Sequence, residues 1–147
     1  MWFKTLEIEC DDWEETMGRL MHFEIHVDDM ERAKQFYGEI FGWSFEDWSE
    51  YAGMPYFGAI TGDVSQPGID GALIKRQTPP PELNQPMNGF SCTIGVDDYD
   101  STEAKILEHG GKIALPKYAL PGMAWQGYYG DTEGNIFGVH QPDENAK

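Results

Sequence analysis

The sequence predicts an α+β protein in which one strand–helix–three-strand (βαβββ) unit occurs twice. Ile25-His-Val-Asp-Asp29 superposes on Ile94-Gly-Val-Asp-Asp98 without a gap, at an offset of 69 residues. Ile69-Asp-Gly71 matches Ile136-Phe-Gly138 at an offset of 67, and a Pro-rich stretch separates the copies. We therefore expect one domain over 21–147, with module 1 at about 21–76, a linker at 77–88 and module 2 at about 89–141.

Each module is expected to begin with a strand. In 22–27 apolar and polar residues alternate, the period-two pattern of a strand with one face on a core. Because successive side chains point to opposite faces, His22, Glu24 and His26 share the face away from that core. The repeat places Ser91, Thr93 and Gly95 in the same way.

A helix is expected after each first strand. Asp28 and Glu31 have capping-box spacing before an apolar stripe, Ala33, Phe36, Tyr37 and Ile40, and Gly42 is placed to end the helix. In module 2, Asp100 and Glu103 take the capping positions and Gly110-Gly111 stops the helix.

Three short strands are expected after each helix, at 43–48, 55–61 and 69–75 in module 1, and at 112–119, 124–129 and 136–141 in module 2. The aligned glycines predict that the last strand of each module turns the following residues to the face of His22: Ile69, Gly71, Leu73 and Lys75, then Ile136, Gly138 and His140. In the linker, Pro79-Pro80-Pro81 and Pro86 forbid helix and internal strand. Residues 1–20 are an N-terminal extension, either an extra edge strand through Leu6, Ile8 and Cys10 or a loosely attached arm.

Composition excludes several classes of partner. Ten Lys and Arg against 26 Asp and Glu give a net charge of −16, which argues against nucleic acid and anionic membrane and suits cationic or neutral small ligands. Cys10 and Cys92 are too few for a disulfide framework and are expected to be free thiols. With no basic, apolar leader and no apolar run of membrane length, a cytoplasmic protein is expected.

The paired pattern resembles the glyoxalase/bleomycin-resistance/extradiol-dioxygenase family, the vicinal oxygen chelate (VOC) superfamily, in its glyoxalase-like branch of mostly unassigned activity. The likeness covers roughly 120 of the 147 residues and is carried by Val27-Asp-Asp29, Phe36-Tyr37, Phe41-Gly-Trp43, Val96-Asp-Asp98, Gly110-Gly-Lys112, Pro116-Lys117 and Asp131-Thr-Glu-Gly-Asn135. It implies a curved mixed sheet of half-barrels around a central cavity, with helices on the convex side, and a homodimer. It also places His22, Glu24 and His26 in the cavity.

Metal-dependent members present a ligand from the first and last strand of each module. These positions map onto His22, Gly71, Ser91 and Gly138, so only His22 matches. About three protein ligands are needed, and we therefore predict no family metal site and no cofactor. The alternative is a divalent metal at a relocated site built from His22, Glu24, His26 and His140.

Candidate site residues follow from these placements. Glu24 and His22 are the candidate catalytic pair, with Glu24 as a proton acceptor that cavity burial would tune. The candidate ligand-binding residues are His26, Ser91, Thr93, Lys75, Trp125, Lys117 and His140, with Lys117 on a loop over the cavity mouth. The structural alternatives are that the histidines are hydrogen-bonded strand residues, and that Trp43, Trp48, Tyr56, Phe57, Trp125, Tyr128 and Tyr129 pack the core and rim rather than clamp a planar or cationic ligand.

The sequence favours a protein that binds a small organic molecule without the family metal, of unassigned activity. The alternative is a lyase, isomerase or dioxygenase acting through a relocated metal or through His22, Glu24 and His26 alone. A third hypothesis is a subunit whose acidic, aromatic surface serves only to bind a partner protein. Whether the protein is an enzyme stays open at this stage.

Overall fold

A computed structural model describes residues 18–82 and 85–147. Module 1 consists of β1 (Glu24–Val27), α2 (Met30–Phe41), β2 (Ser44–Asp47), α3 (Ser49–Ala52), β3 (Tyr56–Ile60) and β4 (Gly71–Lys75). Its strands form a four-stranded sheet in the order β1-β4-β3-β2, in which β1 and β4 are parallel and the other pairs antiparallel. Only α3, a single turn, has no counterpart in the predicted elements.

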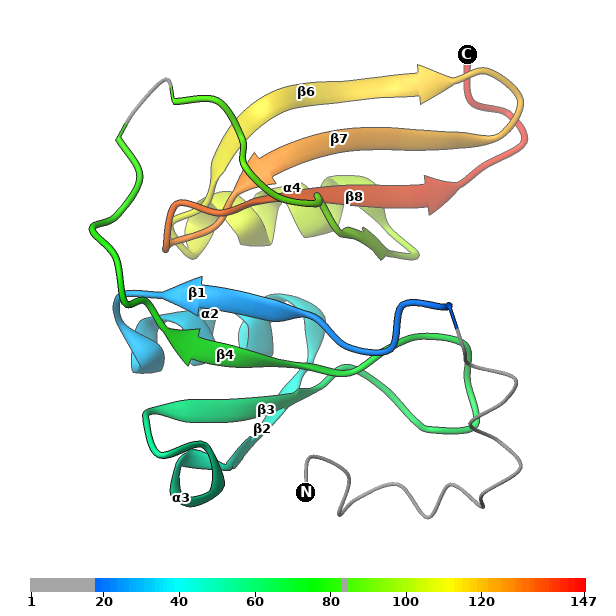
Figure 1. The fold of residues 1–147 in the computed structure, drawn as a ribbon. Coiled ribbons are helices and arrows are strands. Elements are labelled where there is room, and N and C mark those ends of the chain that lie inside the picture. Colours follow the sequence, from blue (N-terminus) through cyan, green and yellow to red (C-terminus); the bar gives the residue numbers. More distant parts are fainter. Residues whose placement is uncertain (1–17, 83–84) are drawn as a thin grey trace.

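Module 2 repeats this arrangement with β5 (Thr93–Gly95), α4 (Tyr99–Glu108), β6 (Lys112–Leu120), β7 (Ala124–Gly130) and β8 (Ile136–Pro142). The sheet order β5-β8-β7-β6 is that of module 1, with β5 and β8 parallel (Figure 1). The predicted α+β class with two βαβββ modules is therefore confirmed. Between β4 and β5, the described linker residues 77–82 and 85–88 are in neither helix nor strand.

The helix caps differ from the prediction by one or two residues. Asp29, not Asp28, caps α2, with its side chain accepting a hydrogen bond from the Arg32 N–H, and Asp98, not Asp100, caps α4 in the same way through Ser101. In both helices the cap is the residue with extended backbone directly before the first helical residue, where its carboxylate reaches a free N–H group. Asp28 precedes that position, and Asp100 lies inside the first turn of α4. Gly42 ends α2 in the left-handed conformation (φ 73°), as predicted.

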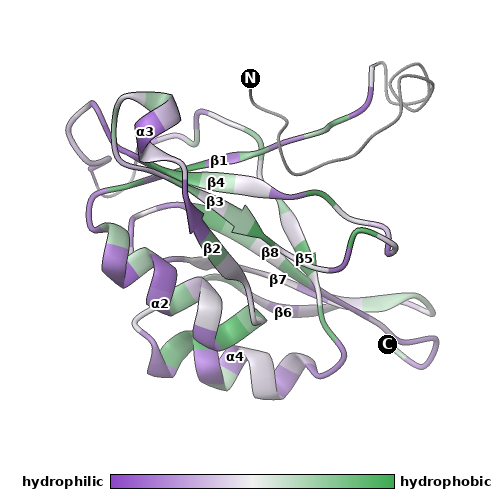
Figure 2. Cartoon of the chain, turned by 90° about the horizontal axis from the view of Figure 1, so that it is seen from below, coloured by the Kyte–Doolittle hydropathy of each residue, from purple (hydrophilic) through white to green (hydrophobic). Residues whose placement is uncertain are grey.

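The two helices cover one side of both sheets. Figure 2 shows α2 and α4 together on that side, where they contact each other. The buried core between helices and sheets includes Val27, Phe36, Tyr37, Leu73, Tyr99, Ile106, Tyr129 and Val139. The opposite side, here called the polar face, carries His22, Glu24, His26 and Tyr56 in module 1 and Thr93, Gln126, Gly138 and His140 in module 2.

The predicted face of β4 is wrong by one residue. Glu24 pairs with Ala72 in module 1, whereas Thr93, its counterpart, pairs with Gly138 in module 2. Ala72 rather than Gly71 is therefore the equivalent of Gly138, and a slip of one residue exchanges the two faces of a strand. Leu73 accordingly lies in the core with 0% exposure, and Lys75 shares its side of the sheet. In β8 the prediction for Gly138 and His140 agrees with the register.

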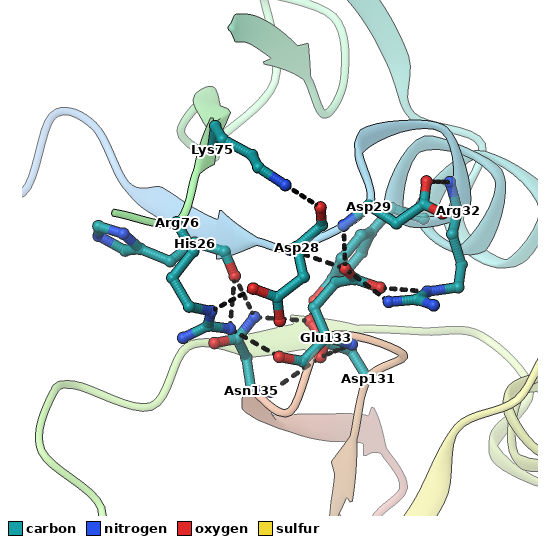
Figure 3. A network of polar contacts seen from close by, with 10 residues as sticks. His26, Asp28, Asp29, Arg32, Lys75, Arg76, Asp131, Glu133 and Asn135 are labelled. Carbon is teal, nitrogen blue, oxygen red and sulfur yellow. Dashed lines mark hydrogen bonds and ion pairs between the residues drawn. The ribbon is translucent and has the colours of Figure 1, made fainter. Parts of the chain in front are cut away.

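The modules are joined by polar contacts between the β7–β8 turn and the start of α2 (Figure 3). One oxygen of the buried Glu133 carboxylate accepts hydrogen bonds from the backbone N–H groups of Asp28 and Asp29, at 2.9 and 2.8 Å. Arg32 donates to both oxygens of Glu133, at 2.7 and 3.1 Å. The turn itself contains Gly134 in the left-handed conformation, at φ 83°.

Further contacts strengthen this junction. The Tyr37 hydroxyl donates to Asp131, and the Asn135 side chain donates to the backbone carbonyl of His26. Among the residues that the structure describes, no helix is long and apolar enough to cross a membrane. The strand predicted through Leu6, Ile8 and Cys10 lies outside the described residues.

Candidate functional site

The polar face of module 1 holds a hydrogen-bonded chain of three side chains. Tyr56 on β3 lies between His22 and Glu24, which precede and begin β1. The Tyr56 hydroxyl is 2.9 Å from His22 Nε2 and 2.9 Å from Glu24 Oε1. Tyr56 is 1% exposed, whereas the other two residues are exposed, so a buried phenol supports two accessible polar groups.

Donor counting fixes the direction of both hydrogen bonds. A phenol has one hydrogen, and Tyr56 donates it to the Glu24 carboxylate. The bond to His22 must therefore be donated by Nε2–H, which leaves Nδ1 of the neutral ring as a hydrogen-bond acceptor. Burial, together with the hydrogen bond to Glu24, raises the pKa of Tyr56, so the phenol keeps its proton at neutral pH.

An aromatic wall adjoins this chain. The Trp48 ring stacks on Tyr56, with 6.4 Å between ring centroids and 21° between planes. A Cβ at Gly58 would come within 2.5 Å of that ring, so the tryptophan needs glycine beneath it. Its Nε1–H donates to Glu46, which places a second carboxylate beside the site.

Module 2 adds a second polar group. His140 Nδ1 is 2.8 Å from the side-chain oxygen of Gln126, which can only accept, so Nδ1 carries the hydrogen and Nε2 is the acceptor of the neutral ring. Gln126 is 5% exposed, and Thr93 is exposed beside it on β5. Ser91 Oγ is buried without a hydrogen-bond partner among the described residues.

Three of the predicted site residues lie elsewhere. Lys75 donates to the backbone carbonyl of Asp28 at the module junction. Lys117 lies within β6 rather than on a loop, because β6 extends through Pro116 to Leu120. Its ammonium is 2.8 Å from Asp100 and 4.6 Å from the centre of the Trp125 ring, and Trp125 packs against the core. Lys117 and Trp125 are thus together, but on the helix side of the sheet.

The residues present do not fit the family metal site. Of the four positions, with Ala72 now replacing Gly71, only His22 offers a metal-binding nitrogen. Within residues 18–82 and 85–147, no three His, Cys, Asp or Glu side chains converge into a set that could hold a metal ion. The relocated site from His22, Glu24, His26 and His140 is not such a set either, and the Tyr56 hydroxyl lies between the first two.

Comparison with known proteins identifies the family. Residues 19–55 match the model described as "Bleomycin resistance protein-like N-terminal". A "Glyoxylase-like domain-containing protein" of Didymella fabae is 30% identical over 135 residues, which cover 83% of this chain and 92% of that protein. The chain belongs to the glyoxalase/bleomycin-resistance (VOC) superfamily. "Putative glyoxylase CFP32" of Mycobacterium tuberculosis is 25% identical over 123 residues, and this chain spans 45% of its length.

Solved structures of the VOC superfamily share the fold. A glyoxalase-related enzyme from Fulvimarina pelagi aligns with a TM-score of 0.62 at 18% identity, covering 85% of this chain and 88% of that one. The fosfomycin resistance protein FosX from Listeria monocytogenes aligns with a TM-score of 0.63 at 14% identity, covering 83% and 91%. At this level of sequence identity the similarity shows only that the fold is shared, and the activities named for these proteins do not transfer to this chain.

Tyr56 was expected only as a packing or ligand-clamping aromatic residue and Gln126 was not expected at the site, yet they hydrogen-bond to His22 and His140. Both residues lie on strands rich in aromatic residues, β3 and β7, whose sequence pattern indicates core packing rather than a polar site. Alternation within 55–61 does place Tyr56 and Gly58 on one face, and the glycine is the signal that a large ring lies over the sheet there.

Proposed function

We propose that this glyoxylase-like protein binds a small organic molecule on its polar face, at the site around His22, Tyr56 and Glu24, without the family metal arrangement. The observation that carries the proposal is the buried Tyr56 hydroxyl, which bonds to two exposed polar groups at 2.9 Å each. Exposed side chains held by a buried partner lose little freedom when a ligand binds, so the site is preorganised.

Charge supports an uncharged or basic ligand. The chain carries a net charge of −16, and a field of that sign raises the local concentration of cations and repels anions. Trp48 and Tyr56 add an aromatic surface on which an apolar or cationic group can lie.

A second candidate function is metal-free proton transfer, of the kind that a lyase or isomerase uses. The observation in its favour is that His22 is oriented through Nε2 by a phenol that a carboxylate supports in turn, as expected for a general base acting at Nδ1. Glu24, the acceptor expected from the sequence, is exposed and lacks the burial that this role requires.

A ligand screen by nuclear magnetic resonance tests the binding function. Isotope-labelled protein is titrated with a library of cationic, neutral and anionic molecules, and the perturbed amides are mapped. We expect perturbation along β1, β3 and β8, and at least a severalfold weaker response in Glu24→Gln.

The matched control is Glu39→Gln, which removes the same charge from an exposed position on α2 and is expected to leave the titration unchanged. Perturbation confined to the helix side, or none with any compound, would show that the polar face is not a binding site. Turnover that needs His22 but proceeds after exhaustive chelation would favour the second function.

The homodimer implied by the resemblance stays a prediction for this chain. Sedimentation equilibrium gives the answer directly, since a monomer has a mass of 16.7 kDa.

A further inference from the structure

Resting on the proposed binding function, we infer that the ligand is a protonated amine whose N–H groups are held by His22 Nδ1 and the Glu24 carboxylate. Neither the fold nor the family specifies the chemistry of the bound group. It follows from which atoms on the polar face have their hydrogens already engaged.

His22 and Glu24 present acceptors. Nε2–H of His22 is donated to Tyr56, and the Tyr56 hydrogen is donated to Glu24. With the imidazole neutral, two hydrogen-bonding groups of this His22–Tyr56–Glu24 network remain open to a ligand: Nδ1 of His22 and the second carboxylate oxygen of Glu24. Both are acceptors, and neither carries a hydrogen that a ligand could accept. A ligand that satisfies both must bring donors.

His140 follows the same rule in module 2. Its Nδ1–H is donated to Gln126, which leaves Nε2 as an acceptor. His22 and His140 thus each donate a ring N–H to a buried side chain, Tyr56 and Gln126 respectively. The Gln126 amide NH₂ and the Thr93 hydroxyl are the donors nearby, and they belong to module 2 rather than to the His22 chain.

The charges of module 1 point to a cation. On its strands, the polar-face positions of β1, β2, β3 and β4 include Glu24 and Glu46 and no Lys or Arg. Two basic residues at the end of β4 are engaged at the module junction: Lys75 donates to the Asp28 carbonyl, and Arg76 donates to the carbonyls of His26 and Glu133. Arg19, three residues before His22, is exposed and lies outside the strands. An anionic ligand would meet two carboxylates on these strands, with no Lys or Arg at the polar-face positions of the same strands.

The aromatic wall of Trp48 and Tyr56 further restricts the kind of amine that fits the site. Trp48 stacked on Tyr56 offers a flat apolar surface beside the two acceptors. We therefore expect an amine that carries an apolar or aromatic body, with its ammonium toward His22 and Glu24.

Three probes that share a phenyl ring separate charge from hydrogen bonding: benzylammonium, benzyltrimethylammonium and benzoate. Each is titrated at pH 8 by calorimetry, with the polar-face amides followed in parallel. The first has both charge and N–H donors, the second has only the charge, and the third has the opposite charge. Because hydrogen bonds to charged groups are stronger than those between neutral groups, benzylammonium should bind at least about tenfold more tightly than either of the others.

A spectroscopic measurement tests the hydrogen-bond directions without any ligand. At pH 8, long-range nitrogen–proton spectra should show His22 as the Nε2–H tautomer and His140 as the Nδ1–H tautomer. In Tyr56→Phe the His22 preference should relax and the benzylammonium affinity fall about tenfold. Tyr51→Phe, at an exposed tyrosine of α3, should change neither.

Glu24→Gln is the second variant, because its exposed position leaves the core intact, and it too should lose about tenfold in benzylammonium affinity. The inference is overturned by a His22 ring protonated at Nδ1 alone, or by benzyltrimethylammonium binding as tightly as benzylammonium. Benzoate binding at the polar face would overturn it while leaving the proposed function standing. Failure of every compound in the wider library to perturb that face would remove both.

Discussion

Tyr99 and Gly127 show how closely a single residue is specified in the core of module 2. The Tyr99 hydroxyl is 2.7 Å from that of Tyr129, which donates to Glu103 at 2.5 Å. A Cβ added at Gly127 would lie 1.9 Å from the Tyr99 oxygen. The phenol cannot move aside without breaking the bond to Tyr129, so glycine is required at this position on β7.

Gly127→Ala should therefore destabilise the protein by about 2 kcal/mol, the usual effect of overpacking a core. The measurement is the urea midpoint at constant m-value. Gly62→Ala is the control, since nothing lies within 4 Å of its added Cβ, and no loss of stability is expected there. Equal midpoints for the two variants would contradict the contact.

At the candidate site, the sequence predicted which residues share a strand face but not which side chains hydrogen-bond to them. Alternation placed His22, Glu24 and His26 on one face, and the structure agrees. It did not reveal that Tyr56, 34 residues from His22, supplies the hydrogen bond, because partners across a sheet depend on register. Lys117 was placed on a loop because Pro116-Lys117 resembles the family's loop over the cavity mouth, although the predicted strand 112–119 includes this residue. It lies in β6, an edge strand with irregular register, where proline is tolerated.

At the scale of elements, the helices depend on their first turns. Asp98 accepts from the Ser101 N–H at 3.0 Å, whereas Asp100, the cap expected from the sequence, pairs with Lys117 at the surface. Capping-box spacing alone could not separate these aspartates, since both precede the same apolar stripe. The deciding property is backbone conformation, which is extended at Asp98 (φ −133°).

Asp98→Ala should cost about 1 kcal/mol of unfolding free energy, the usual value for a lost cap. Asp100→Ala should cost less than about half of that, because exposed ion pairs contribute little. Thermal unfolding followed by circular dichroism at 222 nm compares the two. A larger loss in Asp100→Ala would restore the cap predicted from the sequence.

The sequence predicted where the strands lie, but it predicted which side chains share a face correctly for β1 and β8 and wrongly for β4. The strand positions and the repeat itself follow from the apolar period and the turn residues, whereas the order of the strands in each sheet comes from the structure. The error in β4 arose because Gly71 and Gly138 look equivalent in sequence, while the register pairs Gly138 with Thr93 and Ala72 with Glu24. Gly71 is instead a close-approach position, where a Cβ would lie 2.5 Å from the Phe23 carbonyl oxygen.

At the scale of the whole molecule, Glu133 joins the modules. Its side chain is 0% exposed and Arg32 is half exposed. Burial opposes ionisation of Glu133, but the hydrogen bonds from Arg32 and the Asp29 N–H outweigh it and lower the pKa of this carboxyl. The carboxyl group of Glu133 is thus more acidic in the folded protein than in the unfolded chain, so its ionised form stabilises the fold.

The sign of the pH effect follows. A lowered pKa stabilises the fold above the ordinary glutamate value of about 4.3, and that stabilisation is lost as pH falls through the lower, folded value. Glu133→Gln should therefore cost about 2 kcal/mol at pH 7, because buried donors lose their carboxylate, and the difference from the parent protein should narrow at pH 3.

Urea unfolding at the two pH values measures this difference. Glu31→Gln, which disrupts an exposed pair with Lys34, serves as the control and should differ little from the parent at either pH. A Glu133→Gln deficit that persists undiminished at pH 3 would mean that the charge of this residue does not stabilise the fold.

The junction also bears on how the protein is made. The contacts of Glu133 with Asp28, Asp29 and Arg32 join residues 101 to 105 positions apart. On a translating ribosome, the beginning of α2 emerges long before the turn that completes it, with two backbone N–H groups still open to water. The nascent first module must therefore wait for about a hundred further residues to be made before its helix gains this anchor, so the junction forms only after module 2 has emerged.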